Sequence, residues 1–212
     1  VLYPRWSPEL MLGYGYPVFS FYAPGAYYLV EGLRLLGFSL YTAFILVFCG
    51  LILVAGFGMF LLACDLFGTD HKWSALIAAT AYMFAPYLLS NVYIRGGIAE
   101  TGAQAILPWV LWSMRRLIDA AQTPVLGQPT MRQPAVYLWA VAFSLGSLAI
   151  THTLALLLVP PLLIGYIVVR WWQTGPTLRS LGWVGGALLL AMGISAFFWL
   201  PLLGERSYLA AT

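Results

Sequence analysis

The stretch SLYTAFILVFCGLILVAGFGMFLLACD, residues 39–65, has no charged side chain before its final aspartate. A helix needs about 20 consecutive apolar residues to cross the ~30 Å hydrocarbon core of a bilayer. This stretch exceeds that length, and its polar groups are too few to cover a helix exposed to water. It therefore predicts a membrane-spanning helix.

The composition of the whole chain agrees with this prediction. Charged residues make up 8% of the 212 residues, against about 25% in a typical soluble domain. Hydrophobic residues make up 62%, and the mean hydropathy is +0.87. The apolar runs are continuous rather than alternating. We expect an all-α polytopic membrane protein.

Further apolar runs predict additional spans. Six are expected in all, at residues 39–65, 72–90, 98–118, 134–152, 154–172 and 181–203. Pro86 and Pro108 are expected to bend the second and third, and the pair Pro160–Pro161 to kink or break the fifth. Gly182 and Gly186 form a GxxxG pattern, which permits close helix contact.

The segments outside this bundle are short. Residues 1–38 are expected to form an external loop rich in tyrosine, tryptophan and proline, with a surface helix at 24–36 that is too short to span. Residues 204–212 are expected to form an external tail. The chain begins with Val1 and its first twenty residues do not resemble a signal peptide, so we expect a fragment of a longer chain.

The basic residues favour one orientation. One side of the predicted bundle would hold Lys72, Arg115, Arg116, Arg132, Arg170 and Arg179, and the other Arg5, Arg34, Arg95 and Arg206. Cytoplasmic loops carry the excess of Lys and Arg. The loop at 119–133 is therefore expected in the cytoplasm, and both chain ends outside.

Cysteine and charge patterns exclude two classes of chemistry. Cys49 and Cys64 fall in one predicted helix, roughly 22 Å apart at 1.5 Å per residue, so they cannot form a disulfide. The net charge is only +3 and there is no basic run, which argues against a nucleic-acid partner.

The stretch NVYIRGGIAETG, residues 91–102, places two charges between apolar segments. Gly96 and Gly97 would let the backbone approach a ligand, Arg95 offers a fork suited to phosphate, and the next helix begins with unpaired N–H groups. Glu100 could orient Arg95, bind a sugar hydroxyl or transfer a proton. The alternative is structural: Glu100 balances the helix dipole and Arg95 reaches the headgroups.

Other candidates are expected at the same membrane depth. His152 could shuttle a proton or contact phosphate or sugar, or it could simply hydrogen-bond across helices. Glu9 is a further candidate acid–base group, although one carboxylate does not make a site. Tyr14, Tyr16 and Tyr22 lie in GYGYPVFSFYAP and could form a stacking wall for a sugar or isoprenoid, or an interfacial aromatic belt. We expect Arg95 and Glu100 to face a shared outer cavity with His152 and the GYGYP segment.

Several stretches together resemble a known family. GYGYPVFSFYAP, AYMFAPYLLSNVYIRGGIAE, LPWVLW and THTLALLL occur in this order over about residues 10–160. They resemble bacterial polytopic proteins labelled pyruvoyl-tetrahydropterin-synthase-related, which are similar to the C-type (GT-C) glycosyltransferases. The resemblance implies a GT-C-like bundle in a bacterial plasma membrane, with residues 1–38 as the second half of its first external loop. It also implies a polyprenyl-phosphate-linked sugar as substrate.

The resemblance leaves the function open between classes. The first expectation is a glycosyltransferase core with Glu100, His152 and Glu9 as catalytic candidates, and Arg95, Gly96, Gly97 and the three tyrosines as substrate-binding ones. The alternative is a non-catalytic scaffold or accessory subunit in contact with lipids and other membrane subunits. A transporter is suggested only by Pro160–Pro161. The cofactor is undetermined: a divalent metal is a candidate, but no ligand motif is present.

Overall fold

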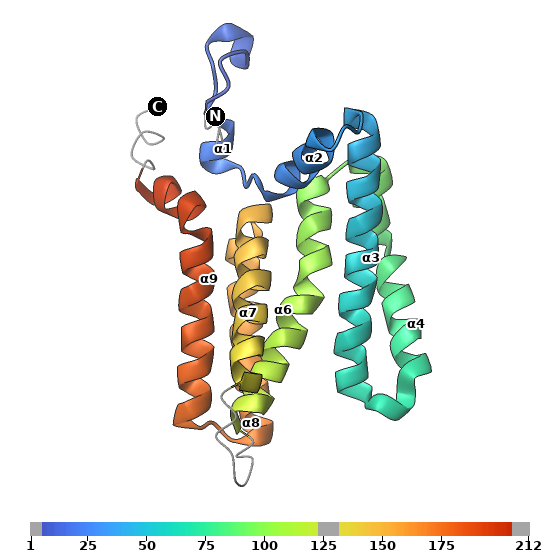
Figure 1. Ribbon diagram of the computed structural model, residues 1–212, viewed down its shortest axis with the longest axis vertical. Coiled ribbons are helices and arrows are strands. Elements are labelled where there is room, and N and C mark those ends of the chain that lie inside the picture. The colour runs from blue at the N-terminus through green and yellow to red at the C-terminus, as the bar shows by residue number, and fades with distance from the viewer. Residues whose placement is uncertain (1–5, 123–131, 205–212) are drawn as a thin grey trace.

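The computed structural model describes residues 6–122 and 132–204 of the chain. Within these residues the regular structure is helical, apart from one isolated β-bridge between Ser7 and Tyr16. Long helices run between two ends of the molecule (Figure 1). We call the end that carries α2 (Gly25–Leu35) the upper end, and the end where α3 (Leu40–Phe67) leads into α4 (Lys72–Met83) the lower end.

The other elements alternate in direction between these ends. The order continues through α5 (Pro86–Ser90), a π-helical turn η3 (Asn91–Arg95), α6 (Ile98–Gln122), α7 (Arg132–Thr151), α8 (Ala155–Thr174) and α9 (Leu178–Gly204). Short turns η1 (Met11–Gly13) and η2 (Thr69–His71) and the four-residue helix α1 (Val18–Phe21) complete the set. The end of α6 lies at the lower end, while the start of α6 and the turn after α7 lie at the upper end (Figure 1). This alternation matches the order of turns that the sequence predicts.

Four described segments are long and apolar enough to cross a membrane. They are Leu40–Phe67, Lys72–Arg95, Gln133–Thr151 and Leu178–Gly204. Each corresponds to one of the six predicted spans. The other two predicted spans form helices α6 and α8, of 25 and 20 residues, but they are not among these four. The count of about six therefore stays a prediction.

Proline acts differently in two of these segments. The segment predicted at 72–90 is bent where predicted: α4 ends at Met83 and Ala85 is extended (ψ 132°), because a residue before proline disfavours helical geometry. At Pro160–Pro161 the expectation is a kink or a break: α8 is one helix from Ala155 to Thr174, so the pair does not break it, and the kink stays a prediction.

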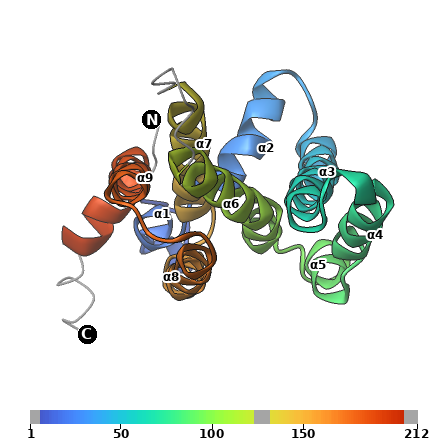
Figure 2. The same ribbon diagram turned by 90° about the horizontal axis from the view of Figure 1, so that it is seen from below.

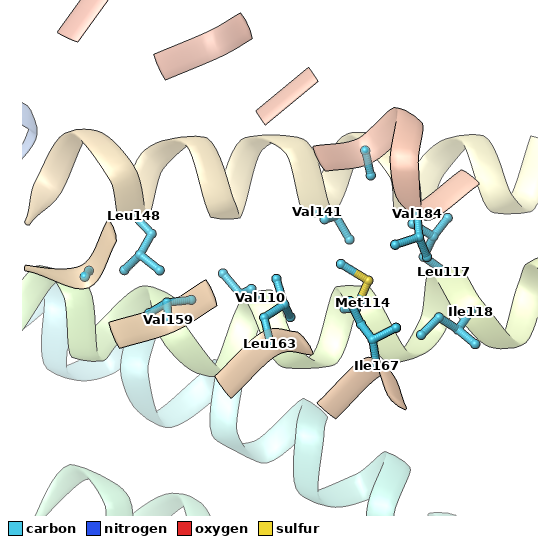
Figure 3. Close-up of a cluster of buried hydrophobic side chains, with 12 residues drawn as sticks. Val110, Met114, Leu117, Ile118, Val141, Leu148, Val159, Leu163, Ile167 and Val184 are labelled. Atoms are coloured by element: carbon cyan, nitrogen blue, oxygen red, sulfur yellow. The ribbon is translucent and has the colours of Figure 1, made fainter. Parts of the chain in front are cut away.

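Helix α6 is the central element of the bundle. Viewed from below, it lies between the group of α3, α4 and α5 and the group of α7, α8 and α9 (Figure 2). Its lower half contributes Val110, Met114 and Leu117 to a buried apolar cluster with α7, α8 and α9 (Figure 3). Its upper half contributes Ile98 and Ala105 to a second cluster with α2, α3 and α5. The two clusters together hold the bundle around α6.

A glycine brings the upper ends of α6 and α7 together. A Cβ atom on Gly102 would lie 2.6 Å from Thr151 Cγ2, so only hydrogen fits there. The expected GxxxG contact is found only in part: a Cβ on Gly186 would meet Leu138 at 3.6 Å, whereas nothing lies within 4 Å at Gly182. The close approach that matters for the site is therefore at Gly102.

Two smaller predictions concern the helices α2 and α3. A helix forms where one was expected at 24–36, namely α2, which carries an exposed ion pair between Glu31 and Arg34 at 3.5 Å, while its place on a membrane surface stays a prediction. Cys49 and Cys64 are both in α3 and neither is in a disulfide. The predicted tail at 204–212 lies outside the described residues except for Gly204.

Candidate functional site at the upper end

The chain between α5 and α6 changes helical form to place Arg95. Residues Asn91–Arg95 form a π-helical turn, a form that frequently occurs at functional sites. Gly96 then adopts the left-handed region (φ +61°), and the N–H of Gly97 donates to the carbonyl of Asn91 at 2.8 Å. Gly96 is therefore the glycine that the turn requires. A Cβ on Gly97 would make only ordinary contacts, at 3.7 Å or more.

Arg95 and Glu100 form a two-pronged ion pair across this turn. Nη2 of Arg95 donates to Oε1 of Glu100 at 2.8 Å, and Nη1 donates to Oε2. The Arg95 side chain is 49% exposed, whereas that of Glu100 is 22% exposed. Such planar, charge-assisted pairing fixes the direction of the guanidinium.

A buried asparagine holds the arginine from the other side. Asn91 is fully buried, and its Oδ1 accepts from Arg95 Nη1 at 2.9 Å. Its Nδ2 donates to the side-chain Oε1 of Gln104 at 3.4 Å. The backbone carbonyl of Gln104 accepts from the hydroxyl of Tyr82 at 2.8 Å. Tyr87 completes the set by donating to Glu100 Oε2 at 3.3 Å.

These four supporting residues did not emerge from the sequence. Tyr82, Tyr87, Asn91 and Gln104 look ordinary in an apolar chain, although Asn91 stands one helical turn before Arg95 and Gln104 one turn after Glu100. That spacing is the signal that could have found them. The result is a continuous polar cluster, which we call the upper cluster: Tyr82, Tyr87, Asn91, Arg95, Glu100 and Gln104.

His152 lies beside the upper cluster. It follows the last residue of α7, and its backbone N–H donates to the backbone carbonyl of Leu148 at 3.2 Å. Burial lowers the pKa of His152 below its ordinary value, and the charge of Arg95 lowers it further, while Glu100 acts in the opposite direction. The imidazole is therefore neutral at pH 7, and it lies close enough to Arg95 and Glu100 for their charges to act on it.

The segment before α1 lies apart from this cluster. Backbone bonds pair Ser7 with Tyr16 in both directions at 2.9 Å, and the hairpin extends beyond the helix ends (Figure 1). Glu9 is exposed, as are Tyr14 at 86% and Tyr16 at 46%. Tyr22 contacts the ring of Tyr27 on α2 at a centroid distance of 6.0 Å.

The expected shared cavity stays a prediction, because neither of the two cavities described is lined by Arg95, Glu100 or His152. Arg95 and Glu100 are bonded to each other, and the charges of both act on His152. The tyrosines of the hairpin and Glu9 do not join them, because the hairpin pairs with itself and leaves these side chains exposed.

An apolar cavity opens next to His152. It has a volume of about 360 Å³ between α7, α8 and α9. Residues on both sides of the His152 turn, Leu148, Ala149 and Ala155, line it, and it extends down to Leu163 and Ile167. Its lining is almost entirely apolar, so it suits a hydrocarbon chain. The upper cluster and this cavity flank the same turn.

The described residues do not form a ready metal site. Among residues 6–122 and 132–204, no three His, Cys, Asp or Glu side chains come close enough to hold an ion. What the upper cluster provides is a fixed guanidinium, a carboxylate and a neutral imidazole. Two N–H donors of Arg95, on Nε and Nη2, have no partner among the described residues. These groups can bind an anion and accept a proton.

Fold and site define a helical protein with four described segments that are long and apolar enough to cross a membrane, and with a polar cluster at one end. An uncharacterized protein from Lactococcus lactis subsp. cremoris (strain MG1363) is 25% identical over 209 residues, which is 94% of this chain. The matched region is 31% of that relative's length, so the chain corresponds to about a third of it. No protein-family model matches the chain, and no solved structure gives a significant match.

Proposed function

We propose that this chain is the membrane core of a GT-C-like glycosyltransferase that uses a polyprenyl-phosphate-linked sugar. The observation that carries the proposal is the junction at His152. On one side of it the upper cluster fixes Arg95, and on the other the apolar cavity of about 360 Å³ begins. A lipid-linked phosphate needs these two environments side by side.

The chemistry makes modest demands on the protein. A polyprenyl phosphate is already a leaving group, so the site has to bind its charge and orient an acceptor. Arg95 would bind the phosphate through its two remaining N–H donors, because Glu100 and Asn91 occupy the others.

His152 is the better candidate for accepting the acceptor's proton. Both carboxylate oxygens of Glu100 already accept hydrogen bonds from Arg95, and Oε2 also accepts from Tyr87, so they are engaged with these partners. His152 is neutral at pH 7 and half-buried, which suits a general base. Glu100 would then serve to orient Arg95.

The proposed setting is a bacterial plasma membrane. In it α6 and α8 join the four apolar segments as spanning helices, giving six, and the upper end faces outward with both chain ends. The excess of Lys and Arg in the predicted lower-end turns supports this orientation. The polyprenyl tail would lie in the cavity between α7, α8 and α9.

A second candidate is a non-catalytic scaffold or accessory subunit of a larger membrane complex. The ion pair itself favours it, because Arg95 and Glu100 neutralise each other and fasten η3 to α6. In that case the upper cluster is a structural clamp. A soluble ligand would then have no effect on it.

The substitution Arg95→Lys separates the two candidates. Lysine keeps the charge and loses the fork. For a phosphate site, the purified variant should keep its thermal unfolding temperature and lose about tenfold or more in affinity for undecaprenyl phosphate, since 1.4 kcal/mol is tenfold. For a clamp, the unfolding temperature should fall and the affinity should not change.

Arg34→Lys is the matched control. Arg34 also lies near the upper end and forms an ion pair with Glu31, but both side chains are about half exposed. It should leave both quantities unchanged. If wild-type protein does not bind undecaprenyl phosphate above a neutral isoprenoid alcohol, the glycosyltransferase proposal is wrong.

A further inference from the structure

Thr151, the last residue of α7, lies where three helices meet at the upper end. It is buried, with only 6% of its surface exposed. A Cβ atom added to Gly102 of α6 would lie 2.6 Å from its methyl carbon Cγ2, and one added to Gly25 of α2 would lie 3.0 Å from its hydroxyl oxygen Oγ1. Both α2 and α6 therefore approach the end of α7 at this residue.

The approach of α2 is a contact with the backbone of α7. A Cβ on Gly25, the first residue of α2, would lie 2.7 Å from the backbone carbonyl oxygen of Ile150. A backbone atom cannot turn aside as the end of a flexible side chain can. The last turn of α7 is thus packed between two glycines, and even one added methyl group would have to displace it.

The hydroxyl of Thr151 fixes the direction of its methyl group. Oγ1 donates to the backbone carbonyl of Ser147, one turn earlier in α7, at 2.6 Å. A bond of this kind selects one side-chain rotamer of a threonine in a helix. In that rotamer the methyl group meets Gly102, so the spacing between α6 and α7 depends on it.

The contact lies next to the charged groups of the upper cluster. His152 directly follows Thr151, and Glu100 stands two residues before Gly102. The backbone N–H of His152 still bonds within α7, so the imidazole moves with the end of that helix. In the part of the chain that the structure describes, Glu100 and Arg95 are the groups whose charges act on His152. A displacement at Thr151 would therefore change the surroundings of the imidazole.

We propose that Thr151 is a positioning residue: packed between Gly25 of α2 and Gly102 of α6, it places His152 beside the ion pair of the upper cluster. It acts through His152 and not on a substrate itself. Helix α2, which precedes the bundle in the sequence, thereby takes part in building the site. The use of this placement for proton transfer rests on the function proposed above, whereas the placement itself does not.

The pKa of His152, measured by NMR, provides the test. The chain has two histidines, and the exposed His71 near the lower end reports any change that affects the whole protein. The full chain, labelled with 13C-histidine, is titrated in detergent without any ligand. We expect Gly25→Ala and Thr151→Ser to raise the pKa of His152 by about 0.5 unit or more, because a displaced imidazole is less buried.

Two further variants are matched controls. Gly32→Ala adds the same methyl group to α2 at a position where it meets open space, so it should leave the pKa of His152 unchanged. Thr151→Val loses the hydrogen bond to Ser147 but keeps the methyl group, and valine has one strongly preferred rotamer in a helix. It should therefore keep the wild-type pKa of His152 where Thr151→Ser does not.

Several results would overturn the proposal. One is an unchanged pKa of His152 in either Gly25→Ala or Thr151→Ser. Another is an equal change in Gly32→Ala or in the titration of His71, since the effect would then be general. A third is an equal change in Thr151→Val and Thr151→Ser, because the methyl contact would then be irrelevant.

The test stays decisive if one variant fails, and it is separate from the proposed function. If Gly25→Ala does not fold, the comparison of serine with valine at residue 151 decides alone. Failure of the wild-type protein to bind undecaprenyl phosphate would refute the glycosyltransferase function and leave the placement of His152 intact. An unchanged His152 in the variants would refute the placement and leave the phosphate site intact.

Discussion

Arg95 and Glu100 pair across two glycines, and a buried third residue, Asn91, accepts a further hydrogen bond from Nη1 of the Arg95 guanidinium. Five residues of separation would place them on different faces of a regular α-helix. The π-helical turn and the left-handed Gly96 change the path of the chain so that they meet.

Gly96 is therefore the first position to test. We expect Gly96→Ala to destabilise the upper cluster by about 1 kcal/mol, because φ +61° is costly for a residue with a Cβ. Gly97→Ala is the matched control and should be nearly neutral, since its Cβ has room. Thermal unfolding in detergent measures both. Equal effects at the two positions would contradict the assignment of the turn.

The contact between α6 and α7 gives a second prediction. Gly102→Ala should lower stability by about 1–3 kcal/mol, because its Cβ would overlap the Thr151 methyl group and push the helices apart. Gly182→Ala, which faces open space, should be neutral or stabilising by about 0.5–1 kcal/mol through helix propensity. Chemical denaturation of the two variants side by side would measure their free energies of unfolding. A harmless Gly102→Ala would mean that the helices are farther apart.

The pKa of His152 predicts a dependence on pH. Its folded-state pKa lies below the unfolded value of about 6.5, so the folded protein resists protonation. The stability linked to His152 is fully present above that unfolded value and decreases as the pH falls through it toward the folded pKa. The unfolding temperature of the wild-type protein should therefore decrease as the pH falls below about 6.5. His152→Gln should lose less, and equal losses would exclude His152 as the cause.

Topology is tested with single cysteines in a variant that lacks Cys49 and Cys64. Tyr93→Cys lies near the upper end, where Tyr93 is 77% exposed, and Lys72→Cys begins α4 at the lower end. A membrane-impermeant thiol reagent added to intact cells should label the first and not the second. Labelling of both from the same side would contradict the alternating arrangement of the helices.

An ion pair between Arg170 and Asp119 at the lower end gives a last prediction. Asp119→Asn should destabilise the protein by about 1–3 kcal/mol, because Arg170 is only 17% exposed and would lose its charged partner. Glu31→Gln is the control, since both members of its pair are about half exposed and such pairs contribute little. Unfolding midpoints in detergent would show the difference. Equal shifts would mean that Arg170 has other partners.

Much of the fold follows from the sequence because it depends on local composition. Helix α3 has 28 residues with hardly any polar group, and a helix satisfies the backbone groups of such a segment within the segment itself. The ends of α7 and α9 fall within a few residues of the predicted spans for the same reason. The proline bend before Pro86 is likewise a local steric effect, and it was predictable.

What the sequence could not determine depends on contacts between distant residues. That His152 lies near the Arg95–Glu100 pair, while Glu9 and the hairpin tyrosines are exposed, follows from the approach of α6 to α7 at Gly102 and from the pairing of Ser7 with Tyr16. The roles of Asn91 and Gln104 also arise only when η3 and α6 are packed together. Hydrophobicity is additive along a chain and can be summed from the sequence, whereas a polar cluster requires specific distances that only the packed helices set.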